Sequence, residues 1–311
     1  MLTRYLPTCC VMSLQYCYPS VSIIDLFYTK SSSRQNSMVE NNLRECVLDK
    51  ILSHKKTDER FTNKIYGNKW MNVRNKWEHC LKTIYPHSHS NIKITKKAGR
   101  TNNYDFEVIY QDKEGNPLCE KHVEFKHNSN SISRIPQFLC LTDRRADFMT
   151  NKYAEYFYDN YLKEYMKVDQ EAFSLLEIPK KPEYLKLIVN HNHNIHPMFK
   201  LFHDRKYFHK NKKDFIVNKS IRSYLDKYSH TLDLGILSEM IMSRQYNKVF
   251  VLWDLKKFHI ETIDQERFVS VVGIEGNSLI VKTPTIKYKL LLRWKNDNGV
   301  LNPAWQISIH K

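Results

Sequence analysis

Glycine is scarce in this sequence, with 7 residues among 311, and no apolar run approaches the roughly 20 residues that span a bilayer. The stretch Val11–Ile24 is interrupted by Gln15 and Pro19 and lacks a small-residue cleavage site, so it does not fit a signal peptide. No repeat with a period of 20–50 residues occurs, which excludes the common repeat architectures. We therefore expect no membrane partner and an intracellular protein in the cytoplasm or nucleus.

The cysteines lack the spacing of a zinc site. None of the seven forms a CxxC pair, and no set of cysteines and histidines has zinc-ligand spacing. We interpret them as reduced intracellular thiols: Cys9, Cys10, Cys17, Cys46, Cys80, Cys119 and Cys140.

The charge balance favours a polyanionic partner. Lysine and arginine total 49 against 33 acidic residues, for a net charge of +16 and a pI near 9.4. Such a bias attracts nucleic acid through steering and counterion release. Richness in Lys, Asn, Ile and Tyr with few Gly is also typical of AT-rich genomes, such as those of large DNA viruses, so the charge alone does not identify an enzyme. DNA is the expected partner, and the choice against RNA stays open.

The length suits one catalytic core with additions. A polar stretch at Ser31–Ser37 separates a leader from the folded part, so we expect residues 1–37 to be a disordered leader and linker, with Met38 an alternative start. Residues 38–170 are the expected core. Residues 171–311 are then an α/β extension with C-terminal β-hairpins that contacts DNA and completes the core.

Periodicity predicts a mixed α/β (α+β) fold, with a central mixed β-sheet flanked by helices and with C-terminal hairpins. Apolar residues at helical spacing predict helices over 39–51 and 70–84, and further helices are expected over 131–141 and 152–166. Alternation or short apolar runs predict strands over 91–95, 104–110, 118–126, 184–189, 248–253, 269–274, 278–282, 287–294 and 305–309.

Two of these strands carry a group of charged residues on one face. The strand period aligns Asp105 with Glu107 and Ile109, and in the next strand it aligns Glu124 with Lys126. Hydrolysis of a phosphodiester needs a hard cation, which prefers carboxylate oxygen. A lysine on the same surface can orient the water or stabilise charge on the phosphate. The alternative interpretation is a hairpin with solvated charges.

The order helix, strand with Asp105, turn, strand with Glu124-Phe125-Lys126 resembles the core of the PD-(D/E)XK nuclease superfamily, over about residues 67–141. In that family the first acid sits on the second core strand and the D/E-x-K triplet on the third. Asn103-Tyr104-Asp105 stands where the family has Pro-Asp, so the proline is absent. The resemblance implies a restriction-endonuclease-like fold, with Asp105 and Glu124 as metal ligands and Lys126 as a catalytic residue.

The resemblance also implies further site residues and a cofactor. Some members add a glutamate from the preceding helix, for which Glu78 is the better placed candidate and Glu45 the poorer, and others use a glutamine on the following helix, for which Gln137 is the candidate. The expected cofactor is Mg²⁺, with Mn²⁺ as an alternative. Cleavage of both strands of a duplex commonly needs two active sites and hence a homodimer.

We therefore expect a metal-dependent endodeoxyribonuclease that resembles restriction enzymes; the alternative is a nucleic-acid-binding protein on the same fold without catalytic activity. Basic segments interleaved with aromatic residues could face DNA, or could simply be solvated: Arg144-Arg145, His203–Lys213 and Lys256-Lys257. The histidines on polar segments, which could bind a softer metal but favour solvated loops, are His87, His89, His191, His193 and His196.

Overall fold

The computed structural model describes residues 20–30, 34–97, 102–174, 176–189, 193–296 and 300–310. The chain divides into two compact units, each of which is discontinuous in sequence. Unit 1 extends to Arg134 and resumes over Arg244–Asp264, and unit 2 comprises Ile135–Ser243 and Gln265–Lys311. The predicted α/β class is confirmed, whereas the boundary predicted at residue 170 does not coincide with either unit. No helix in the described ranges is long and apolar enough to cross a membrane.

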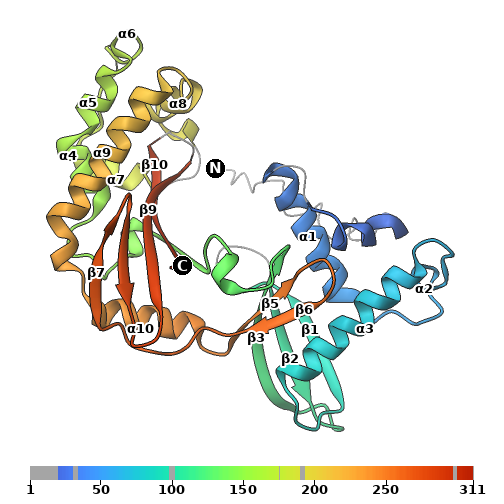
Figure 1. Ribbon diagram of the computed structural model, residues 1–311. Helices are drawn as coiled ribbons and strands as arrows, with labels where there is room; N and C mark the ends of the chain where they lie inside the picture. The colour runs from blue at the N-terminus through green and yellow to red at the C-terminus, as the bar shows by residue number, and fades with distance from the viewer. Residues whose placement is uncertain are drawn as a thin grey trace, which may run out of the picture. The chain divides into compact units, whose positions relative to one another are not determined.

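Unit 1 contains a mixed five-stranded sheet, which we call sheet A, in the order β1-β2-β3-β5-β6 (Figure 1). Its strands are β1 (Asn91–Lys96), β2 (Phe106–Gln111), β3 (Pro117–His127), β5 (Lys248–Trp253) and β6 (Phe258–Glu261). The first three strands form the predicted antiparallel meander, and β5 pairs with β3 in parallel. A parallel pair needs a crossover connection, and here the crossover contains most of unit 2.

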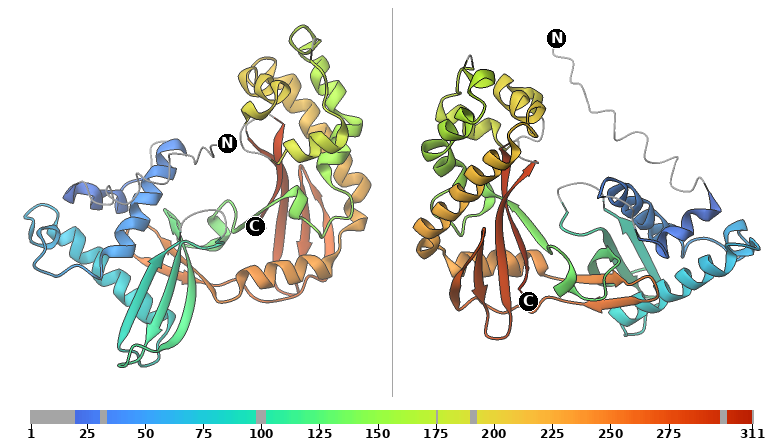
Figure 2. Two further views of the ribbon diagram at one scale, coloured as in Figure 1. Left: turned by 180° about the vertical axis from the view of Figure 1, so that it is seen from behind. Right: turned by 45° about the horizontal axis from the view of Figure 1, so that its top comes forward.

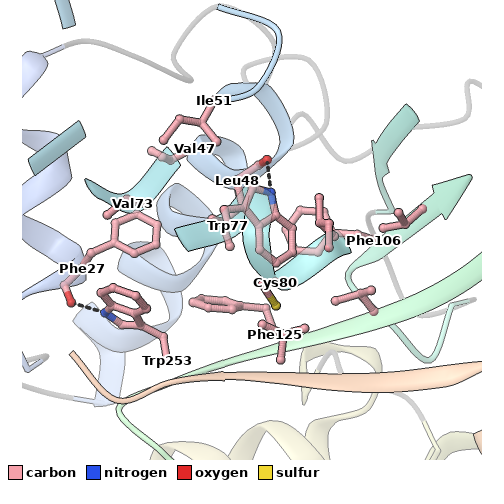
Figure 3. Packing of buried hydrophobic residues seen from close by; sticks show 14 of the residues in the cluster. Phe27, Val47, Leu48, Ile51, Val73, Trp77, Cys80, Phe106, Phe125 and Trp253 are labelled. Carbon is pink, nitrogen blue, oxygen red and sulfur yellow. Dashed lines mark hydrogen bonds between the residues drawn. The ribbon is translucent and has the colours of Figure 1, made fainter. Parts of the chain in front are cut away.

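One face of sheet A is apolar because alternate residues of β2 and β3 are hydrophobic. Phe106, Val108 and Val123 are fully buried there. They pack with α3 (Gly67–Ile84), whose Trp77 lies in the same cluster and donates a hydrogen bond of 3.1 Å to the carbonyl of Leu48 (Figure 3). The polar residues of these strands therefore lie on the opposite face.

Residues 20–30 are part of this core, contrary to the expectation that they belong to a disordered leader, whereas residues 1–19 and 31–33 of the predicted leader and linker lie outside the described residues. A 3₁₀ helix, η1 (Val21–Phe27), buries Ile24 and Phe27 completely, and Trp253 donates an indole hydrogen bond to the carbonyl of Phe27 (Figure 3). The buried Arg44 of α1 (Arg34–Lys50) donates a hydrogen bond of 2.8 Å to the carbonyl of Leu26. The apolar residues of this segment are too few for a sequence period, but Ile23, Ile24 and Phe27 all join the buried cluster.

Unit 2 contains an antiparallel five-stranded sheet, sheet B, in the order β4-β10-β9-β8-β7. Its strands are β4 (Leu139–Thr142), β7 (Ser270–Glu275), β8 (Ser278–Lys282), β9 (Lys287–Asn296) and β10 (Leu301–Ile309), which include the predicted C-terminal hairpins. Helices cover one face of sheet B (Figure 2). Tyr153 of α4 (Tyr153–Asn160) contacts Trp294 of β9, and Tyr224 of α9 (Lys210–Tyr228) contacts Trp305 of β10, so aromatic rings form much of this core.

The remaining elements are short helices and turns. In unit 1 they are α2 (Glu59–Thr62) and η2 (Ile132–Arg134); in unit 2 they are η3 (Asp143–Arg145), α4 (Tyr153–Asn160), α5 (Leu162–Lys167), α6 (Gln170–Phe173), α7 (Lys181–Leu187), η4 (His193–Ile195), α8 (Pro197–Asp204), α9 (Lys210–Tyr228) and η5 (Ser229–Thr231). The helix α10 (Leu234–Gln245) ends directly before β5.

Two predicted elements are wrong. The segment 131–141 is not a helix: it forms the turn η2 and then β4, because Leu139 and Leu141 pair with β10 near the other end of the chain. The segment 184–189 is not a strand but part of α7, where Pro182 occupies the first turn and Tyr184 and Ile188 bury the same helix face.

Candidate active site on sheet A

Asp105 stands directly before β2, beside Glu124 on β3. Phe106 pairs with Val123 across the two antiparallel strands, so the next register position places Asp105 opposite Glu124. The Asp105 N–H donates to the carbonyl of Val123 at 2.9 Å, and the Phe125 N–H donates to Asp105 Oδ2 at 2.8 Å. Both carboxylates lie on the face of sheet A opposite the apolar core, as the strand period predicts.

Glu124 forms ion pairs with two lysines. Its Oε1 pairs with Lys126 on the same strand, and its Oε2 pairs with Lys248 at the start of β5. Lys248 is 4% exposed and also donates a hydrogen bond of 3.1 Å to Asn103 Oδ1. The side chain of Lys126 is 32% exposed. One lysine is therefore enclosed, and the other can meet a ligand from solvent.

Burial and charge shift the pKa values of this group. Burial, with the neighbouring Glu124, raises the pKa of Asp105, and Lys126 opposes the shift. Burial acts to lower the pKa of Lys126, but Glu124 and Asp105 outweigh it and the pKa is raised. Burial lowers the pKa of Lys248, with Glu124 opposing. The site therefore favours additional positive charge near its carboxylates and holds Lys126 protonated.

The glutamate that joins this group is Glu45 of α1, the candidate that the sequence ranked lower. Burial and the charge of Asp105 raise the pKa of Glu45 to about 7. Glu45 pairs with Lys96 of β1 at 3.3 Å. Lys126 also acts on Glu45 electrostatically, which places Glu45 at the border of the site.

Glu78, the candidate that the sequence ranked higher, lies elsewhere on unit 1. It pairs with Lys82 one helical turn further along α3, at 2.7 Å, and its side chain is 41% exposed. Glu78 lines a groove of about 620 Å³ between the end of α1, α3 and β1. None of Asp105, Glu124 and Lys126 lines that groove. The structure thus does not bring Glu78 together with them.

Gln137 is not on a helix, so the helical setting expected for it is wrong. It lies in the loop between η2 and β4 and belongs to unit 2. Its Oε1 atom is buried and has no hydrogen-bond partner among the described residues.

The side chains limit the kind of metal that the site could hold. Within the described ranges, no group of three or more His, Cys, Asp or Glu is arranged to bind a metal ion. Asp105 and Glu124 supply two carboxylates, and Asp105 Oδ1 accepts no hydrogen bond from any described residue. Two carboxylates completed by water and substrate phosphate fit Mg²⁺, which seldom uses an all-protein cage. Carboxylate and water ligands also suit Mn²⁺. His191 lies outside the described residues, and His193 stacks on His203 at 3.6 Å between ring centroids.

Sequence reasoning missed Lys248 and Asn103. Asn103 accepts from Lys248 and donates to the carbonyl of Arg244 at 2.7 Å, so it joins the start of β2 to the end of α10. A sequence signal did exist, because Lys248 opens a strand whose other residues are all apolar, and a buried lysine there requires an acidic partner.

No protein-family model, no curated protein and no solved structure matches this chain.

Proposed function

We propose that this protein is a metal-dependent nuclease of the PD-(D/E)XK type that hydrolyses phosphodiester bonds in DNA. The observation that carries the proposal is the grouping of Asp105, Glu124 and Lys126 on one face of adjacent strands. These strands are the second and third of a meander that follows a helix, which is the arrangement that the resemblance implies.

Asp105 and Glu124 are the residues that would hold Mg²⁺. When bound, the ion would neutralise phosphoryl charge and lower the pKa of a water molecule. Asp105 is oriented for this role by its hydrogen bond from Phe125, which fixes one carboxylate oxygen. Glu124 is held by its two lysines, so its carboxylate is ordered in the absence of a ligand.

The two lysines would have different roles. The partly exposed Lys126 stays protonated and can donate to a phosphate oxygen or to the attacking water. The enclosed Lys248 balances the charge of Glu124 and positions it. We assign Lys126 to the reaction and Lys248 to positioning.

Plasmid cleavage tests the proposal. Supercoiled DNA incubated with the full chain should be nicked or linearised with Mg²⁺ or Mn²⁺ and should stay intact with EDTA. Asp105→Asn should remove the activity, and Glu78→Gln should leave it unchanged, because Glu78 lies in a separate groove. Cleavage that persists in Asp105→Asn would show that the activity belongs to another site or to a contaminant.

The second candidate is a nucleic-acid-binding protein without catalytic activity. It is favoured by the pairing of both oxygens of Glu124 with lysine ammonium groups, which balances the carboxylate without a metal ion. Under this alternative, the same plasmid would shift in a gel without being cut. If the protein does cut duplex DNA, a homodimer is the proposed assembly, and sedimentation with a duplex would measure it.

A further inference from the structure

Unit 2 exposes three aromatic rings within one short segment, where α8 ends and α9 begins. We define the α8–α9 corner as Arg205–Phe215. Tyr207 is 70% exposed, Phe208 is 49% exposed and Phe215 is 66% exposed. Rings of this size are usually mostly buried, so a group of exposed ones points to a binding surface.

Cations accompany these rings. Lys206 Nζ lies 5.0 Å from the centroid of the Tyr207 ring, and the Arg205 guanidinium lies 4.2 Å from the centroid of the Phe208 ring. Lys210 and Lys212 are exposed at the start of α9. The first turn of α9 contains no acidic residue, so its lysines face the positive end of the helix dipole, an unfavourable placement for folding. A polyanion at this position would relieve the repulsion.

The corner is held in a defined conformation. Arg205 makes two hydrogen bonds to the buried Asp169, of 2.6 Å from Nε and 2.9 Å from Nη2. Lys213 is also buried, and it donates to the carbonyl of Arg205 at 2.8 Å. His209 adopts a left-handed backbone, with φ 51°, where the chain enters α9. The rings are therefore presented on an ordered turn, which lowers the entropic cost of binding.

We propose that the α8–α9 corner binds single-stranded nucleic acid, with phosphates at Lys210 and Lys212 and with unpaired bases stacked on Tyr207, Phe208 and Phe215. Bases in a duplex already stack on one another, whereas an exposed ring beside a cation matches the base faces and phosphates of a single strand. The choice of nucleic acid as partner rests on the proposed function. The inference deepens that function by assigning to unit 2 the capture of unpaired segments.

Binding of the full chain to a fluorescent oligothymidine, measured by anisotropy in EDTA, tests the inference. Tyr207→Ala and Phe208→Ala should each weaken binding by about tenfold, the scale of one lost base-stacking contact. Lys210→Ala should reduce the slope of log affinity against log salt by about 0.7, as for one lost phosphate contact on a single strand. The matched control is Ile65→Ala, which removes an equally exposed apolar side chain (73%) from unit 1 and should bind as the parent does.

Three outcomes would overturn the inference. One is unchanged oligothymidine binding in Tyr207→Ala and Phe208→Ala. Another is that the two variants lose as much affinity for a blunt duplex as for oligothymidine, which would mean that the rings do not stack on unpaired bases. The third is that the parent protein sediments with anionic phosphatidylserine vesicles and Tyr207→Ala and Phe208→Ala do not, although both variants bind oligothymidine as the parent does. That result would make the corner a membrane-surface contact.

The assay is independent of the cleavage site. Because it contains EDTA, it requires no metal at Asp105 and Glu124, and Glu78→Gln in its separate groove should bind oligothymidine as the parent does. Failure of the nuclease proposal would therefore appear as plasmid that stays intact while oligothymidine binding is normal. Failure of the present inference would appear as plasmid that is cleaved while Tyr207→Ala and Phe208→Ala bind oligothymidine as tightly as the parent.

Discussion

The ammonium of Lys248 and the carboxylate of Glu124 form a buried ion pair between the parallel strands β5 and β3. Glu124 also pairs with Lys126, and Lys248 also donates to Asn103 and lies 4.8 Å from the centroid of the Phe250 ring. The pair joins two segments that are more than a hundred residues apart in the sequence. Its main effect is to fix the carboxylate that we assign to the metal.

Loss of Glu124 should therefore destabilise the fold as well as abolish cleavage. Glu124→Gln leaves the buried ammonium of Lys248 without its counter-ion, and breaking a buried pair in this way costs about 3–5 kcal/mol. The double variant Glu124→Gln/Lys248→Met removes both charges and should recover much of the stability without recovering activity. Urea unfolding measures the difference, and a double variant no more stable than Glu124→Gln would contradict the pairing.

Lys126→Ala should separate catalysis from binding. The cleavage rate should fall by roughly 10²–10³-fold, the scale expected for loss of one electrostatic stabiliser. DNA affinity should change little, because one phosphate contact alters the salt slope by only about one unit. The matched control is Lys97→Ala, since Lys97 pairs with Glu107 at 3.0 Å and has a similar side-chain exposure of 27%. A parent-like rate in Lys126→Ala would remove Lys126 from the mechanism.

Phe27→Ala should show that the 3₁₀ helix η1 stabilises unit 1. Phe27 is fully buried and contacts Phe125 and Trp253. Its truncation to alanine should therefore lower the free energy of unfolding by about 3–5 kcal/mol. Val39→Ala, at a 56% exposed position, is the control and should stay within about 0.5 kcal/mol of the parent. Equal unfolding midpoints for the two variants would mean that η1 does not pack on the core in solution.

Glu45 should make stability depend on pH in an unusual direction. Burial and the charge of Asp105 raise the pKa of Glu45 to about 7 in the folded state, above the ordinary glutamate value of 4.5. The folded state then binds the proton more tightly than the unfolded chain, so this contribution is complete below pH 4.5 and is lost as the pH rises through 7.

Glu45→Gln stays neutral and should not show this loss. Its melting temperature should be close to that of the parent at pH 5 and higher than that of the parent at pH 8. Melting curves of the two proteins across this range measure the effect. If the melting temperature of the parent instead rises relative to that of Glu45→Gln as the pH increases, the folded state prefers the ionised carboxylate of Glu45 and the prediction is wrong.

Local patterns predicted those parts of the fold that depend on near neighbours. The alternation around Phe106 and Val123 was sufficient to identify both strands and to assign Asp105, Glu124 and Lys126 to one face. The helix predicted over 152–166 is present as α4 and α5, which meet at Tyr161. The run from Tyr184 was ambiguous, since short apolar runs fit a buried helix as well as a strand.

The remaining site residues depend on distant segments. Glu45 reaches the site because of the way α1 packs against β1, and the helical period contains no information on that packing. Proximity in sequence favoured Glu78, yet the side of α3 that holds Trp77 faces the core and leaves Glu78 toward a groove. Lys248 is brought beside Glu124 only by the parallel pairing of β5 with β3.

The chain crosses between the two units three times, after Arg134, Ser243 and Asp264. During synthesis on a ribosome, β3 is made long before β5, and the polypeptide that links them must close a large loop before the strands can pair. The carboxylates of the candidate site therefore exist without Lys248 while Ile135–Ser243 of unit 2 is being made. A protein interrupted between Glu124 and Lys248 would carry Asp105 and Glu124 but could not assemble the site.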